Sequence, residues 1–240
     1  MSQEREEAVV LRGVDFSETS RIVTFLTPGR GRLACIAKGA RRRKSPLQAV
    51  LDTLNRVEIV YYWKDGRAVQ QLGEAALLDG FGAIKADLEK TSFAALPLEF
   101  ALRVAHENEP SQELYAALVG GMESLAAGQG DVRMHASWQM ARLLAAAGFE
   151  PGLDACAMCG APVEDAPGFS YEGGVTCSAC RADRRLDAEE LAVLRTFMRS
   201  RAACPASRRL DGVYRVLCEY AMRQLETDLH SVQVIDEMFG

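Results

Sequence analysis

Four cysteines in the second half of the chain are spaced as a metal-binding site requires. They form two Cys-x2-Cys pairs separated by residues 160–176, and they are Cys156, Cys159, Cys177 and Cys180. A two-residue gap lets both thiolates of a pair reach one ion from a tight turn, and Gly160 permits that geometry without a side-chain clash. The spacing lies within the range typical of structural zinc sites. We therefore predict one Zn²⁺ ion held by four thiolates.

Four protein thiolates would close the zinc tetrahedron and leave no position for a catalytic water, which predicts a structural metal. The segment has few large apolar side chains, so zinc binding energy on the order of 10 kcal/mol would decide whether it folds. A redox-active dithiol and a chance arrangement are the alternatives. The start MSQEREEAVVL lacks a signal-peptide pattern, and no run approaches the length of a membrane span. We therefore expect a cytoplasmic protein, in which these cysteines are not expected to form disulfides.

Residues typical of catalytic sites are otherwise scarce. The histidines His106, His135 and His230 are isolated in the sequence, and neither a phosphate-binding loop nor a nucleophile elbow is present. Hydrophobic residues make up 48% of the chain and charged residues 25%, which is typical of a protein that folds around a core. The sequence therefore favours a folded protein that is not an enzyme.

A run of cations occurs in KGARRRKSP, residues 38–46. Its members are Lys38, Arg41, Arg42, Arg43 and Lys44. The 240-residue chain has a formal net charge of −5, but residues 1–80 carry 13 Lys and Arg against 10 Asp and Glu, whereas residues 81–240 carry 15 against 23. Only the first third is therefore expected to offer a surface to a polyanion. A solvated loop without a partner is the alternative.

Segments rich in β-branched and apolar residues surround this run and predict strands. They cover residues 8–16, 21–27, 32–39, 55–64 and 67–75. Asp65 and Gly66 suit a two-residue hairpin turn between the last two. Five strands in about 75 residues are typical of a small closed barrel, for which the oligonucleotide-binding fold (OB-fold) is the commonest solution. Such a barrel holds single strands with cations on phosphates and aromatic rings on bases.

Side chains near the basic run are further candidates for such an interface. We add Arg30 and Arg32 on grounds of charge and proximity. Tyr62, on the outward face of the fourth strand, is a candidate for stacking on a base or an ordinary surface residue, and Phe16 at a strand end is likewise undecided. The residues predicted to fill the barrel from that strand are Val57, Ile59, Tyr61 and Trp63.

From residue 80 onward the sequence predicts helices. Segments rich in Ala, Leu, Glu and Arg cover residues 84–106, 111–127, 131–147, 187–201 and 208–229. Pro97 is expected to kink or split the first. We thus predict an α+β multidomain protein. It consists of a five-stranded OB-fold β-barrel at residues 1–80 and an α-helical domain at residues 81–240, with a four-cysteine zinc-finger element inserted at about 152–183.

Several of these segments together resemble one family, the RecO DNA repair proteins, which are bacterial recombination mediators. RLACIAKGARRRKS (32–45) is similar to the family's strand followed by A-K-G-x-R-x-x-K-S. SETSRIVTFLT (17–27), LGEAALLDGF (72–81) and the Cys-x2-Cys pairs add to the likeness, which spans nearly the whole chain.

The resemblance implies an OB-fold barrel, a helical domain and a zinc element. It also implies binding of single- and double-stranded DNA, annealing of complementary strands, and work with RecR, and in some bacteria RecF, to load RecA onto DNA coated by single-strand-binding protein. Such a protein would act in the cytoplasm, at the nucleoid during repair. By matching positions, the DNA contacts are Lys38, Arg41, Arg42 and Lys44, and the zinc ligands are the four cysteines. Arg43 is an addition from charge and proximity.

Two other classes of function stay open. A nucleic-acid-processing enzyme would need clustered carboxylates for magnesium, whereas the acidic residues are scattered over the predicted helices. An RNA-binding OB-fold protein would differ by a preference for the 2′-hydroxyl. Single-strand-binding protein ends in an acidic, apolar-tipped tail, for which the candidate arginines are Arg133, Arg142, Arg199 and Arg201.

Overall fold

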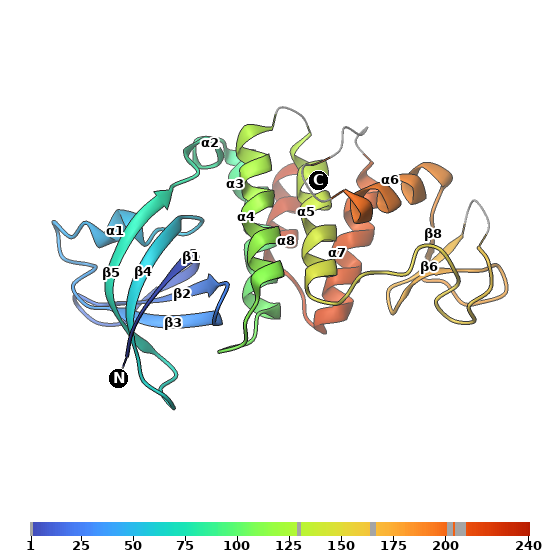
Figure 1. Cartoon of the computed structure of the whole chain (residues 1–240). Coiled ribbons are helices and arrows are strands. Elements are labelled where there is room, and N and C mark those ends of the chain that lie inside the picture. The colour runs from blue at the N-terminus through green and yellow to red at the C-terminus, as the bar shows by residue number, and fades with distance from the viewer. Residues whose placement is uncertain (1, 129–130, 164–166, 201–203, 205–209) are drawn as a thin grey trace.

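In the computed structural model the chain forms three regions that lie in a row: a β-barrel, a group of helices and a small sheet (Figure 1). The structure describes residues 2–128, 131–163, 167–200, 204 and 210–240. The N-terminus lies on the barrel and the C-terminus among the helices (Figure 1). Within the described part of the chain, no helix has the length and apolar character needed to cross a membrane.

The first region is a closed five-stranded barrel. Its strands are β1 (Ser2–Asp15), β2 (Arg21–Thr27), β3 (Gly31–Ala37), β4 (Arg56–Trp63) and β5 (Gln70–Asp79). Around the barrel they follow the order β1-β2-β3-β5-β4, and only the β3–β5 pair is parallel. A short helix, α1 (Leu47–Val50), lies between β3 and β4. The predicted OB-fold is confirmed, and the barrel closes where Cys35 and Ile36 of β3 pair with Gln70 and Gln71 of β5.

Alternation of side chains along the strands fills the barrel. Val57, Ile59 and Tyr61 of β4 point inward and are buried, as predicted, whereas Trp63, the fourth residue predicted to fill the barrel, is only half-buried against its core. The Tyr61 hydroxyl lies 2.9 Å from a carboxylate oxygen of Glu4 and 2.8 Å from one of Glu6, so the polar end of this buried ring is satisfied.

The connection between β4 and β5 differs from the predicted two-residue hairpin. Asp65 and Gly66 do form a turn, but only Gly66 has a positive φ, 72°. The Arg67 N–H closes this turn on the Lys64 carbonyl (3.2 Å). β5 begins only at Gln70, whose side-chain oxygen accepts from the Lys64 N–H (2.9 Å) and whose amide donates to the Arg67 carbonyl (2.8 Å). These bonds satisfy the backbone of a longer connection, which strand propensity does not encode.

The second region consists of helices packed around one core. They are α2 (Gly82–Lys85), α3 (Leu88–Val104), α4 (Gln112–Ala127), α5 (Val132–Ala146), α6 (Ala188–Arg199), α7 (Asp211–Leu225) and α8 (His230–Phe239). The first predicted helix is split before Asp87 and not at Pro97. The Asp87 carboxylate accepts from the Lys90 N–H (3.0 Å) and so caps α3. α3 continues through Pro97, and burial of that residue in the core compensates for the missing backbone hydrogen bond.

The last predicted helix, residues 208–229, corresponds to α7, and α8 beyond it was not predicted. α7 ends at Leu225, because Glu226 adopts the left-handed conformation (φ 51°). α8 begins at His230, five residues after the end of α7, and the Glu99 carboxylate of α3 accepts from the N–H groups of His230 (3.1 Å) and Ser231 (2.8 Å). The Ser231 hydroxyl also donates to Glu99 (2.8 Å). Since the cap comes from a helix 132 residues away in sequence, the local pattern could not reveal where α8 begins.

The barrel packs directly against the helices. The side chains that its outer face adds to the helical core are Val9, Leu11, Leu26 and Leu54. Polar bonds flank this contact: the Tyr115 hydroxyl donates to Glu7 (3.2 Å), and the Arg32 guanidinium donates to the Leu102 carbonyl (3.1 Å). The boundary expected between residues 80 and 81 stays a prediction, because the two regions share one core.

The third region lies between α5 and α6. Its strands, in the order β7-β6-β8, are β6 (Gly168–Ser170), β7 (Gly174–Thr176) and β8 (Arg184–Arg185). Phe169 and Val175 are fully buried within the core of the helices, and the Phe169 ring centroid lies 5.8 Å from that of Tyr220 on α7. The insertion therefore shares the helical core, whereas the sequence suggested that it depends on metal alone.

Candidate nucleic-acid interface and metal centre

Residues 38–46, which we call the basic loop, connect β3 to α1 through a series of turns. The Arg42 N–H donates to the Gly39 carbonyl (3.1 Å), and the Ser45 N–H donates to the Arg42 carbonyl (2.8 Å). Gly39 has a φ of 74°, a conformation that favours glycine. Ala40 is only 2% exposed and packs in the barrel core. The loop is therefore anchored at Ala40.

All five predicted cations of the basic loop are exposed. Arg41 forms an ion pair with Asp15 (3.1 Å), and Lys38 Nζ lies 3.5 Å from the Gln71 side-chain oxygen. The other three are Arg42, Arg43 and Lys44. Among the residues that the structure describes, no acidic side chain lies within ion-pairing distance of these three. Their charges are therefore available to an external anion.

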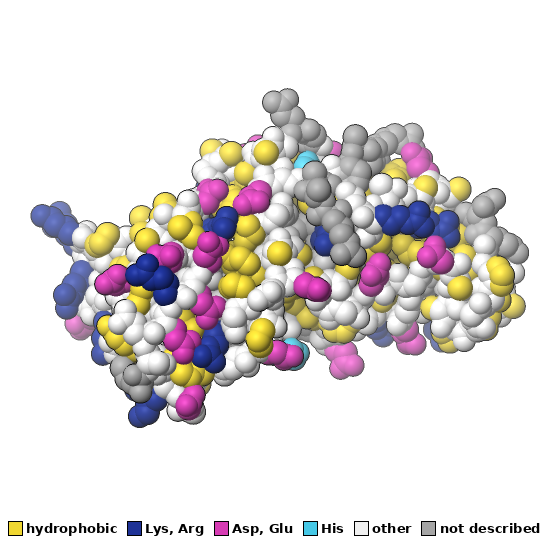
Figure 2. All heavy atoms as spheres, in the orientation of Figure 1, with side chains coloured by type: hydrophobic (Ala, Val, Ile, Leu, Met, Phe, Trp, Pro, Cys, Tyr) yellow, Lys and Arg dark blue, Asp and Glu magenta, His cyan; other side chains and the backbone are white. Residues whose placement is uncertain are grey.

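These cations lie at the end of the barrel that points away from the helices. α1, which follows the basic loop, lies at this end in Figure 1, and several Lys and Arg side chains protrude from it in Figure 2. Because like charges on one exposed surface add to a positive potential, this end can attract a polyanion even though the whole chain is acidic.

Arg30 and Arg32 are not brought together with the basic loop. They flank the start of β3, whereas the basic loop follows its end, roughly 20 Å away at about 3.3 Å per residue. Arg30 donates three hydrogen bonds to the Glu4 carboxylate (2.9, 2.9 and 3.2 Å) and lies 4.1 Å above the Trp63 ring. Arg32 pairs with Glu107 (3.4 Å) in the segment after α3. Both charges have partners within the fold, and their contact with DNA stays a prediction.

The two aromatic candidates differ in exposure. Tyr62 is half-buried, and its ring covers Gly73 of the neighbouring strand β5. Phe16, by contrast, is 62% exposed in the loop between β1 and β2. Alternation placed Tyr62 on the outward face of its strand but could not show whether it stacks on a base, and for Phe16 at a strand end it gave no direction at all.

The four predicted ligand cysteines come together beside the small sheet. Their Sγ atoms all lie within 4.8 Å of one another, and Cys159 Sγ is 3.7 Å from Cys177 Sγ. The Gly160 N–H donates to the Cys156 carbonyl (2.8 Å), which closes the first turn. The Cys180 N–H closes the second on the Cys177 carbonyl (3.2 Å). Zn–S bonds of about 2.3 Å place tetrahedral sulfurs about 3.8 Å apart, so this group can hold a metal ion and its dimensions fit zinc.

The electrostatics of the cluster also favour a cation. Backbone N–H groups, that of Cys177 foremost, lower the pKa of the Cys156 thiol to about 6. The surrounding sulfurs, that of Cys177 foremost, raise the pKa of Cys180 to about 12. Without a cation the four thiols therefore cannot all ionise at neutral pH, because adjacent thiolates repel. A divalent ion at their centre would remove that repulsion and complete the site.

The arginines proposed for an acidic tail lie in different environments. Arg133 is only 4% exposed and hydrogen-bonded inside the helical core. Arg142 is half-buried, and Arg199 lies 4.0 Å from Asp154. Arg201 lies outside the described residues. No common surface of these arginines emerges within the part of the chain that the structure describes.

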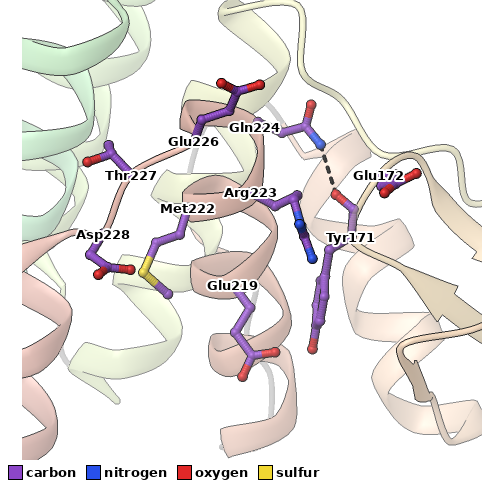
Figure 3. A pocket seen from close by; sticks show the side chains of 9 residues that line it. All are labelled: Tyr171, Glu172, Glu219, Met222, Arg223, Gln224, Glu226, Thr227 and Asp228. Carbon is purple, nitrogen blue, oxygen red and sulfur yellow. Dashed lines mark hydrogen bonds between the residues drawn. The ribbon is translucent and has the colours of Figure 1, made fainter.

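An open cavity of about 1060 Å³ lies between the small sheet and α7 (Figure 3). The acidic side chains that line it are Glu172, Glu219, Glu226 and Asp228. The Gln224 side chain donates to the Tyr171 carbonyl at one edge (2.9 Å). This surface would repel phosphates, in contrast to the barrel end.

Comparison with known proteins identifies the family to which this chain belongs. The model of the N-terminal part of recombination protein O matches residues 1–81, and that of its C-terminal part matches residues 85–233. A DNA repair protein RecO from Anaeromyxobacter dehalogenans is 33% identical over 182 residues, covering 75% of this chain and 71% of the relative. Those from Streptomyces griseus (30% identical, 99% of this chain and 100% of the relative) and a Nocardioides species (31%, 97% and 98%) align over nearly their whole length. The chain therefore belongs to the RecO family of DNA repair and recombination proteins.

Proposed function

We propose that this protein binds single- and double-stranded DNA through the basic loop and anneals complementary strands, without acting as an enzyme. The observation that carries the proposal is the exposure of Arg42, Arg43 and Lys44 at the free end of the barrel, with no acidic partner among the described residues. Cations presented in this way bind phosphates and release condensed counterions, which is the main source of sequence-independent affinity for DNA.

The positive charge of the basic loop would also promote the annealing of complementary strands. Two complementary strands repel one another through their phosphates, and this repulsion opposes the first base pairs. The basic loop would neutralise phosphates on one strand or on both, so the strands approach at a lower cost in free energy. No covalent bond is made or broken, so the step needs neither a catalytic residue nor an open metal position.

The four-cysteine cluster would bind zinc and hold the insertion in shape. The Ala157 N–H, inside the first cysteine turn, donates to the Val175 carbonyl of β7 (2.8 Å), and Val175 is buried in the helical core. A zinc ion that joins the two turns would therefore fix them to a strand that is already anchored.

Protein partners would bind the acidic helical region. The family resemblance implies RecR, single-strand-binding protein, RecA and, in some bacteria, RecF as partners at the nucleoid. Residues 81–240 carry 23 Asp and Glu against 15 Lys and Arg, so they would keep DNA on the barrel and leave surfaces such as the cavity of Figure 3 free for proteins. Loading of RecA would then combine DNA held at one end with partners held at the other.

Replacing Arg42, Arg43 and Lys44 together by alanine tests the proposal. Affinity for a labelled single-stranded oligonucleotide should fall, and the slope of log K against log salt should become shallower by about 2, since each phosphate contact contributes about 0.7. The unfolding temperature should not change, because these side chains make no ion pair among the described residues. Fluorescence anisotropy over a series of salt concentrations measures the slope.

A matched control removes the same charge from elsewhere on the barrel. Arg5, Lys64 and Arg67 are exposed and lie outside the basic loop, so their joint replacement by alanine should leave the slope nearly unchanged. Equal losses in the two variants would show that net charge, and not the basic loop, sets the affinity. Strand cleavage in the presence of Mg²⁺ would favour a nuclease, and tighter binding to RNA than to DNA would favour an RNA-binding protein.

A further inference from the structure

An exposed apolar stripe crosses the barrel beside the basic loop. In the strand register Val14 of β1 faces Ile22 of β2, and Ile22 faces Ile36 of β3. Val14 is 46% exposed and the two isoleucines are half-buried. Phe16, two residues beyond Val14, is 62% exposed. We call Val14, Phe16, Ile22 and Ile36 the apolar stripe; none of the four belongs to either hydrophobic core.

The position of Phe16 is set by its backbone. The Phe16 N–H donates to the Ser20 carbonyl (3.1 Å) and closes the loop between β1 and β2. The Ser20 N–H donates in turn to the Ser17 hydroxyl (3.2 Å). Within the described residues, no other aromatic ring packs against Phe16. The ring is therefore largely exposed on a loop whose backbone is held by hydrogen bonds.

The loop that carries Phe16 is joined to the basic loop. The Arg41 N–H donates to the Thr19 carbonyl (3.1 Å), and its guanidinium donates to the Ser17 carbonyl (2.6 Å). At the other end of the stripe, Lys38 follows Ile36 by two residues and lies outside the barrel core. Cations thus stand at both ends of the apolar stripe.

A ligand that matches this surface must combine flat apolar faces with closely spaced negative charges. A nucleotide with an unpaired base has both, because its base stacks on an aromatic ring while its phosphate binds a cation. The bases of a duplex are already paired and stacked, so only their phosphates could reach this surface. Charge complementarity and an exposed ring together therefore favour single-stranded nucleic acid over a duplex.

We propose that Phe16 stacks on an unpaired base of single-stranded DNA whose phosphates lie on the basic loop, and that Val14, Ile22 and Ile36 contact the neighbouring nucleotides. The inference rests on the proposed DNA-binding function and adds to it a residue that distinguishes single strands from duplexes. In an annealing protein such a contact would be given up when the base enters a pair, which favours release of the finished duplex.

Phe16→Ala in the full-length protein tests the inference. Affinity for a single-stranded oligonucleotide should fall roughly 5- to 150-fold, the range expected for one lost base–aromatic contact. Affinity for a duplex of the same length should stay the same, and so should the slope of log K against log salt, because no phosphate contact is lost. On a strand whose sugar-phosphate backbone carries no bases, wild type and Phe16→Ala should bind equally.

Two further variants separate stacking from other effects. Phe16→Leu keeps an apolar side chain without a ring and should lose nearly as much affinity as Phe16→Ala, whereas Phe16→Trp should keep it. Leu88→Ala, which removes a 67% exposed side chain from the helical region, should bind like wild type. A full-affinity Phe16→Leu variant would overturn stacking in favour of a plain apolar contact.

The outcomes also separate this inference from the proposed function. If wild type binds single strands and Phe16→Ala binds them equally well, the stacking contact is wrong and DNA binding by the basic loop stands. If Phe16→Ala weakens single strand and duplex by the same factor, the ring does not read unpaired bases and the inference fails. A wild-type protein that binds no single-stranded DNA overturns both.

Discussion

The basic loop and the four-cysteine cluster are both groups of side chains that repel one another when charged, and the fold treats them in opposite ways. The basic loop holds its cations apart in solvent, with Ala40 as its buried anchor. The cluster holds four sulfur atoms within 4.8 Å of one another beside a strand that is buried in the helical core. The first arrangement needs a counterion from outside the molecule, whereas the second needs one at its centre.

Because of this difference, we expect the basic loop to matter for binding and the four-cysteine cluster to matter for stability. Water and salt screen the exposed cations, so leaving them without an acidic partner costs the fold little stability. The basic loop can therefore remain unpaired in the absence of a polyanion. Four thiolates within 4.8 Å of one another repel even where they are partly exposed, so we expect a bound cation to stabilise the insertion that holds them. We therefore expect changes in the basic loop to alter binding alone and changes in the cluster to alter folding first.

The largest expected effect on folding comes from the metal centre. Cys177→Ser removes one of the four proposed ligands, from the second cysteine turn, and should abolish stoichiometric zinc, since binding on the order of 10 kcal/mol is coupled to folding of such sites. The insertion should become sensitive to limited proteolysis and the unfolding temperature should fall, while affinity for single-stranded DNA persists. Metal content by mass spectrometry, proteolysis and a gel shift measure the three properties.

Cys204→Ser is the matched control, because it replaces a half-buried thiol outside the cluster. It should retain one zinc per chain. Loss of DNA binding by Cys177→Ser at an unchanged unfolding temperature would contradict the separate roles of the two regions. The four-cysteine cluster would then be part of the DNA interface.

Glu99 differs from both the basic loop and the four-cysteine cluster, because its charge has hydrogen-bond and ion-pair partners inside the fold. Burial raises the pKa of Glu99, but the N–H and hydroxyl of Ser231, the N–H of His230 and the Arg103 charge outweigh it and hold the pKa below its usual value. The ionised Glu99 carboxylate therefore contributes its full share to the free energy of unfolding above the usual carboxyl pKa of about 4.3. This contribution is lost as the pH falls through the lower pKa of Glu99 in the folded protein. Glu99→Ala should reduce the free energy of unfolding by about 1–2 kcal/mol near neutral pH.

Urea denaturation across a pH series measures this effect. The difference between wild type and Glu99→Ala should shrink in acid, where the wild-type carboxylate becomes protonated. Glu237→Ala, at an exposed position of α8, serves as the control and should change little at any pH. A difference that is independent of pH would show that Glu99 acts through packing and not through its charge.

The smallest expected effect concerns Arg41, the one cation of the basic loop with an ion-pair partner among the described residues. Arg41→Lys keeps the charge but loses the forked contact with Asp15 and the Ser17 carbonyl. Because the pair is exposed, the free energy of unfolding should fall by at most about 1 kcal/mol. Hydrogen exchange in the loop between β1 and β2 should become faster, whereas Arg43→Lys should leave both quantities unchanged.

Structural features that depend on residue type at a short, regular spacing could be predicted from the sequence. Alternation identified the inward face of β4, and the Cys-x2-Cys spacing identified a group of sulfurs that the structure brings together. Turns and caps that depend on the hydrogen bonds of single side chains were not predictable. The Gln70 side chain lengthens the connection between β4 and β5, and Glu99 on α3 sets the first residue of α8. Neither contact leaves a local signal.

The sequence by itself determined which residues carry the chemistry, because a run of cations and two pairs of cysteines are recognisable from residue type and spacing alone. Only the tertiary structure decided which of them face a ligand. Arg30 and Arg42 are equally basic in the sequence, yet Arg30 is paired with Glu4 beside the Trp63 ring whereas Arg42 faces solvent. The physical reason is that a charge becomes available or engaged according to the partners within a few ångströms of it, and those partners come from strands and helices that only folding brings together.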